Sequence, residues 1–139
     1  MSKIVKPIYE QKPFDECVSN MIEFKYNKRN LCDMCEVLRK DLLLEYPYPE
    51  FEGERFLSEV IVTGNMAKKY DMVYVPIPIY IAEYLDDGLS KNWLKNVTRC
   101  PNGARANSQM FMDKAYKFDI RLKNCIEFGV FSFLAKKTT

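Results

Sequence analysis

The sequence of 139 residues contains no histidine. Histidine is the commonest general base in enzymes and the commonest protein ligand of metals, so its absence excludes the usual form of both kinds of site. Any acid–base chemistry in this chain must therefore use carboxylates, tyrosine, lysine or cysteine.

The chain also lacks a large excess of positive or negative charge, and it lacks long apolar runs. The formal net charge is only +2, which does not argue for binding to nucleic acid or to an anionic membrane. No run of about 18 apolar residues occurs, as a membrane-spanning helix would need. Residues 1–10 lack the apolar stretch of a signal peptide. The five cysteines are an odd number without a secretory signal, which favours reduced thiols and a cytoplasmic location.

What is present is the composition of one globular domain, with 47% hydrophobic and 29% charged residues. Strand-like patterns come first and helical patterns come last, which predicts an α+β fold with a thin sheet. The predicted strands are 4–9, 21–26 and 72–85. The predicted helices are 36–46, 56–70, about 90–97, 104–117 and 119–137, with a turn at 101–103.

The segment 51–59 reads FEGERFLSE and gathers carboxylates where a loop leads into a predicted helix. Glu54 and Glu59 flank the first turn, with Arg55 between them. A carboxylate held in such a place can act as a general base if it lies near a hydroxyl. The alternative is structural, because acidic residues at a helix N-terminus also complement the helix dipole.

This segment belongs to a longer ordered set of motifs. The chain carries YPYPEFEGERFLSEV at 46–60, KY at 69–70, YIAEYL at 80–85, DGLS at 87–90 and then Asn92. The set covers roughly residues 30–110 and resembles the late part of the catalytic domain of bacterial family 2 glycosyltransferases, which build cell-surface polysaccharides.

The resemblance implies the C-terminal portion of a GT-A-like domain that transfers a sugar, with inversion, from a nucleotide sugar to a glycan acceptor. The full-length family uses a divalent metal, Mg²⁺ or Mn²⁺. Matched by position, Glu59 is the expected general base and Glu54 the alternative. The expected substrate-binding residues are Arg55, Asp87, Gly88 and Ser90.

Two parts of the family pattern are missing. The sequence has no apolar strand leading to a nucleotide-binding segment and no Asp-x-Asp element to hold a metal. We therefore expect the acceptor-side part of a transferase without its nucleotide-binding half, with no metal bound by this chain and no transfer activity from it alone.

Other readings remain open. Cys32-x-x-Cys35 has the spacing of a zinc or redox pair, but no second pair accompanies it, and incidental thiols are the alternative. Phe128, Phe131 and Phe133 belong to an aromatic C-terminal helix that suits core packing, a homo-oligomer contact or a peripheral membrane contact. A non-catalytic module that self-associates or docks on a partner is accordingly the second functional hypothesis.

Overall fold

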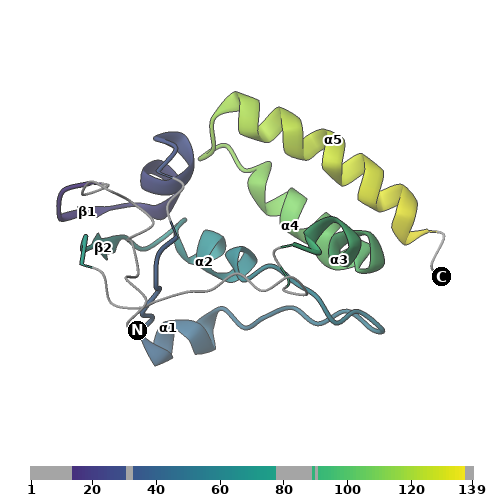
Figure 1. Ribbon diagram of the computed structural model, residues 1–139, viewed down its shortest axis with the longest axis horizontal. Helices are drawn as coiled ribbons and strands as arrows, with labels where there is room; N and C mark the ends of the chain where they lie inside the picture. Colours follow the sequence, from purple (N-terminus) through teal and green to yellow (C-terminus); the bar gives the residue numbers. More distant parts are fainter. Residues whose placement is uncertain (1–13, 31–32, 78–88, 90, 137–139) are drawn as a thin grey trace, which may run out of the picture.

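The computed structural model describes residues 14–30, 33–77, 89 and 91–136, and its fold is mixed α+β, as predicted (Figure 1). A two-stranded sheet lies at one end of the molecule and a group of helices at the other. In chain order the elements are β1 (Cys17–Ser19), the π-helix η1 (Ile22–Asn27), α1 (Lys40–Glu45), α2 (Val60–Met66), β2 (Met72–Tyr74), α3 (Trp93–Arg99), α4 (Pro101–Phe111) and α5 (Phe118–Ala135).

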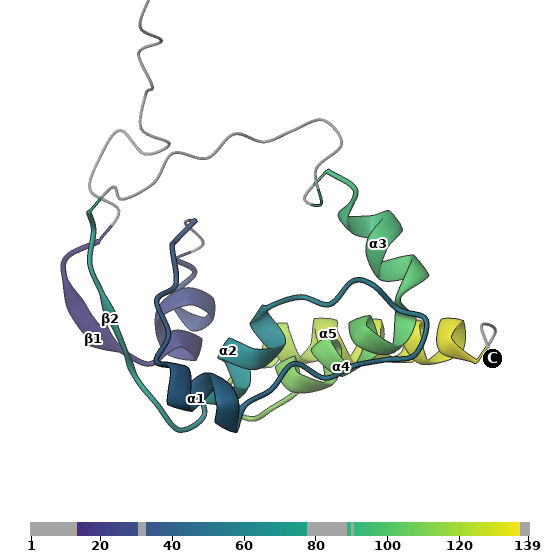
Figure 2. The same ribbon diagram turned by 90° about the horizontal axis from the view of Figure 1, so that it is seen from below.

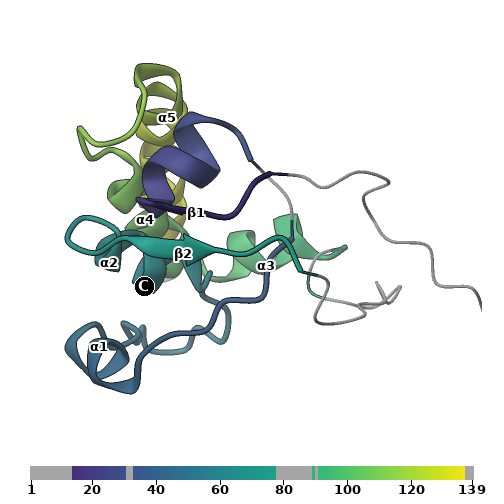
Figure 3. The ribbon, with the colours of Figure 1, turned by 90° about the vertical axis from the view of Figure 1, so that its left-hand side faces the viewer.

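The sheet is short and antiparallel. Cys17 pairs with Tyr74, and Val18 with Val73. Both valines are exposed to solvent on one side of the sheet. On the other side, the Tyr74 ring stacks on Phe24 of η1 with 3.8 Å between ring centroids. Figure 3 shows η1 on one side of the two strands and α1 on the other. Burial on one face alone fits the alternating pattern that predicted a strand from residue 72. The strand ends at Tyr74, so the prediction of a strand through 75–77 is wrong, and the predicted stretches 78–85 and 4–9 lie outside the described residues.

The predicted strand at 21–26 is wrong, because this segment forms η1. The side-chain oxygen of Asn20 accepts a hydrogen bond from the N–H of Ile22, and the Asn20 carbonyl accepts one from Phe24. At the other end, the Asn27 side chain accepts from the N–H of Lys117 at 3.0 Å and donates to the carbonyl of Ala115 at 3.1 Å. Contacts with residues about 90 positions away therefore hold a helix where local alternation favoured a strand.

Two predicted helices are shorter than expected. Residues 33–39 alternate between exposed and half-buried side chains, and Arg39 has extended dihedral angles, so α1 begins only at Lys40. Residues 51–58 form a loop, so α2 begins at Val60 rather than at 56. The side-chain amide of Asn20 donates to the carbonyl of Ala67, where α2 ends.

The C-terminal helices were predicted in place but not in all their bounds, because α3 begins at Trp93 rather than near 90, and α4 ends at Phe111 rather than at 117. The expected turn at 101–103 is the first turn of α4, with Pro101 at the N1 position that proline favours. From there α4 packs against α5, and this is the most extensive contact between two elements in the described residues (Figure 1). Seen from below, α3 extends away from that pair (Figure 2).

The core lies where α2 meets η1 and α4. One cluster of buried residues joins η1, the end of α2 and α4, and a second lines the other side of α2. Gly64 of α2 faces the first cluster, and a Cβ built on it would lie 2.5 Å from Sδ of Met110. That sulfur already accepts a hydrogen bond from the Tyr116 hydroxyl at 3.1 Å. The absence of a side chain at residue 64 is therefore what lets α2 approach α4.

We predict that Gly64→Ala destabilises the fold, because displacing Met110 in a close-packed core costs about 1–3 kcal/mol, against about 0.5–1 kcal/mol gained in helix propensity. Gly129→Ala is the matched control, since a Cβ at Gly129 meets nothing within 4 Å. That variant should gain about 0.5–1 kcal/mol from helix propensity. Urea denaturation followed by circular dichroism measures both, and equal effects of the two variants would contradict the close approach.

Candidate functional site

The loop 51–59 is shaped by a turn at its start. The N–H of Glu54 donates to the carbonyl of Phe51 at 3.1 Å, and Gly53 has a φ of 75°. Only glycine adopts this left-handed conformation without strain. The turn directs the Glu54 side chain toward the N-terminus of α4.

Glu54 is bound to the first turn of α4. The N–H of Asn102 donates to its Oε1 and the N–H of Gly103 to its Oε2, each at 2.7 Å. The N-cap residue Cys100 makes no side-chain cap bond, so the carboxylate of a distant loop satisfies two of the free N–H groups of this helix. A Cβ on Gly103 would lie 3.3 Å from Glu54 Oε2, so glycine leaves room for this close approach.

Glu59, in contrast, is exposed and occupies the N-cap position of α2. Its carbonyl accepts a hydrogen bond from the N–H of Val62 at 3.1 Å, but its side chain makes no cap bond. The two candidate bases therefore differ. Both oxygens of Glu54 hold backbone N–H groups, and the Glu59 carboxylate is accessible to a solute.

A second carboxylate, which sequence reasoning missed, shares the electrostatic surroundings of Glu59. Burial raises the pKa of Tyr26 well above its ordinary range, and the charges of Glu36 and Glu59 add to this effect. The pKa of Tyr48 is raised by burial and then by the same two charges. Glu36 and Glu59 therefore act on the same two phenols, although 23 positions separate them in the sequence.

The direction of the Glu36 side chain follows from the extended path of residues 33–39. In that segment the side chains of Met34, Glu36 and Leu38 are half-buried, while those between them are exposed. Nζ of Lys25 lies 3.7 Å from the Glu36 carboxylate, and both side chains are about one-fifth exposed. The prediction of a helix from residue 36 concealed this placement, because a polar residue on a helix is ordinarily a solvated one.

The structure describes only some of the other predicted site residues. Arg55 is exposed on the loop between the two glutamates. Asp87, Gly88 and Ser90 lie outside the described residues, as does Cys32, and the side chain of Cys35 is exposed. The described part of the chain contains no group of three or more Cys, Asp or Glu side chains arranged to hold a metal. Within the same residues, no helix is both long enough and apolar enough to cross a membrane.

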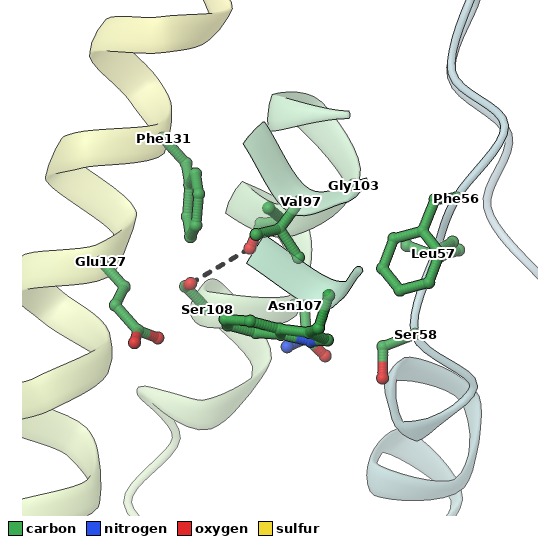
Figure 4. Close-up of a pocket in the computed structure, with 11 residues that line it drawn as sticks. Phe56, Leu57, Ser58, Val97, Gly103, Asn107, Ser108, Glu127 and Phe131 are labelled. Atoms are coloured by element: carbon green, nitrogen blue, oxygen red, sulfur yellow. Dashed lines mark hydrogen bonds between the residues drawn. The ribbon is translucent and has the colours of Figure 1, made fainter. Parts of the chain in front are cut away.

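A small cavity lies beside the loop, between Phe56, Leu57 and Ser58 and the helices α3, α4 and α5 (Figure 4). Its volume is about 50 Å³. Asn107 lines it, and within the described residues the buried Oδ1 of Asn107 has no hydrogen-bond partner. A polar cavity of this size suits ordered water and is too small for a sugar ring. Of the two candidate bases, Glu59 is the one whose side chain is exposed, and it lies outside this cavity.

Comparison with protein-family models, with characterised proteins and with solved structures finds no match for this chain.

We predict that Glu54→Ala destabilises the protein by about 1–3 kcal/mol, because two N–H groups of α4 lose a charged acceptor. Glu54→Gln should lose less, since its amide retains one acceptor oxygen. Glu52→Ala is the control, because Glu52 is exposed two residues earlier in the same loop. Chemical denaturation compares the three, and an effect of Glu54→Ala no larger than that of Glu52→Ala would contradict the capping role.

We also predict that stability falls at alkaline pH. Burial, with the charge of Glu36 as a smaller contribution, raises the pKa of Tyr74 to about 12, whereas tyrosine in the unfolded chain ionises near pH 10. Between these values the native state holds the proton that the unfolded state has lost, so the free energy of unfolding decreases as pH rises. Tyr74→Phe should make this decrease shallower, and denaturation curves from about pH 8 to about pH 11 test it. Parallel pH profiles for the two proteins would refute the assignment.

Proposed function

We propose that this chain supplies the acceptor side of an inverting glycosyl transfer, with Glu59 as the general base. The observation that carries the proposal is the contrast between the two glutamates of the FEGERF segment. Glu54 fixes the loop to α4, and Glu59 remains accessible at the start of α2. The ordered motif set from 46 to 92, which resembles that of family 2 glycosyltransferases, supports the same assignment.

The chemistry requires little of the protein beyond position. A carboxylate oxygen of Glu59 accepts the proton of an acceptor hydroxyl. As the proton leaves, the oxygen of that hydroxyl attacks the anomeric carbon of the donor. The bond from the anomeric carbon to the diphosphate oxygen breaks on the opposite face, so the configuration inverts. Glu54 acts as a positioning residue, because its two hydrogen bonds hold the loop that leads to Glu59.

Tyr48 is the aromatic side chain best placed to contact a sugar. It is 50% exposed, and the charges of Glu59 and Glu36 act on its hydroxyl. A flat aromatic surface beside carboxylates suits a pyranose ring, whose C–H groups face the ring plane while its hydroxyls reach the acids. Tyr74 does not offer such a surface, because it is buried against Phe24.

The donor nucleotide and its divalent metal are assigned to no residue of this chain. The described residues do not form a set of ligands that fits Mg²⁺ or Mn²⁺. No step of the proposed transfer therefore passes through a metal bound by these residues.

The test is a Glu59→Gln substitution in a protein that joins these 139 residues to a nucleotide-binding half. We expect kcat to fall by about 10²–10⁴ with a smaller change in the acceptor KM, since the amide cannot accept the proton. Glu52→Gln is the matched control and should retain the parental rate. Full activity of Glu59→Gln would overturn the proposal.

A further inference from the structure

The helix α5 has two apolar faces. One face packs on α4 and on the core, and it includes Ile120 and Phe131. The other, here called the outer face, is exposed along the whole helix. Its large side chains are Phe118 (73% exposed), Leu122 (50%), Ile126 (64%), Val130 (53%) and Phe133 (61%).

The spacing of the outer face is that of a helix packing surface. Successive positions are separated by four, four, four and three residues, which keeps them on one stripe of an α-helix. Cys125 and Gly129 are exposed positions on the same stripe. A helix that is apolar on opposite sides is typical of one covered on both, so the outer face requires an occupant.

We propose that the outer face of α5 binds the same face of a second copy of this chain, with the two helices antiparallel. The five large side chains expose on the order of 600 Å² together, so a symmetric pair buries at most about 1,200 Å², the lower end of the range for specific interfaces. A two-fold axis near Ile126 brings each copy of the stripe onto the other, because its positions are nearly symmetric about that residue.

The charges of α5 lie away from the centre of the outer face. Lys123 is at its edge and forms an ion pair with Glu127 of the same copy at 3.5 Å. Glu127 itself lines the small cavity against α4 (Figure 4), and Nε of Arg121 donates to the carbonyl of Met112. A second copy therefore meets apolar side chains along the centre of the outer face.

The same charges argue against a membrane as the occupant. Within 118–136 the basic residues are Arg121, Lys123 and Lys136 and the acidic residues are Asp119 and Glu127, which leaves a net charge of +1. Asp119 is itself paired with Arg29 at 2.6 Å. An interfacial helix that binds anionic lipid carries a strongly basic polar face, which α5 lacks.

The first experiment measures association of the whole chain by sedimentation equilibrium. The unmodified protein should be a dimer, and Ile126→Glu should raise the dissociation constant at least a hundredfold by placing a charge at the centre of the interface. Leu94→Glu is the matched control, because Leu94 is 70% exposed on α3 and the chemical change is the same. Circular dichroism of both variants verifies that they remain folded.

The second experiment tests the orientation with the natural cysteine of the outer face. In the antiparallel pair the two Cys125 side chains lie on the same side of the axis and close together, whereas in a parallel pair they lie on opposite sides. Mild oxidation should therefore yield a disulfide between the two Cys125 residues, identified by mass spectrometry of the tryptic peptides, and Cys125→Ser should abolish it. A linked pair of Cys125 residues supports the arrangement.

Three results would overturn the proposal. The first is a monomer at concentrations of about 100 μM, well above those at which a specific interface of this size associates. The second is a dimer that Ile126→Glu and Leu94→Glu affect equally. The third is retention of the monomer on vesicles of phosphatidylcholine and phosphatidylserine through Ile126, which would make the outer face a lipid-binding surface.

Discussion

The contact between the Glu54 carboxylate and the first turn of α4 is the interaction on which the candidate site depends. Among the described residues, no other hydrogen bond joins the segment 51–58 to α3, α4 or α5. The contact orders a loop that is rich in charge, satisfies a helix that lacks its own cap, and delivers the chain to the beginning of α2. Because the carboxylate and the N–H groups come from segments about 50 residues apart, the loop and α4 are ordered by one another.

Much of the helical half was accessible to sequence reasoning, and the reason is physical. The helices α3, α4 and α5 follow helical patterns that act within a few residues, although Pro101 was predicted to lie in a turn and in fact begins α4. The same holds for the start of β2 at Met72, where apolar residues alternate. The aromatic content of α5 was also visible, although its division into a face toward α4 and an outer face requires the packed structure.

The rest depended on contacts that no local pattern reports. Residues 22–27 alternate in a way that suits a strand, yet Asn20 and Asn27 bind distant backbone groups and hold them in a helix. At the site, the motif singled out Glu54 and Glu59 as a pair, but the structural role of Glu54 follows only from the position of α4. Glu36 was not identified as a site residue, because the helix was predicted to begin at residue 36, four residues before α1 begins.

The bonds of Asn27 to the segment between α4 and α5 have a consequence for the order of folding. The two helices are neighbours in sequence and can form their hairpin through short loops, which close quickly. The junction with η1 instead closes a loop of about 90 residues, whose entropy cost must be met before the asparagine bonds can form. We expect the hairpin to form early and the N-terminal third of the chain to join it last. Slow refolding of this protein would then report the docking of Asn27 rather than the formation of its helices.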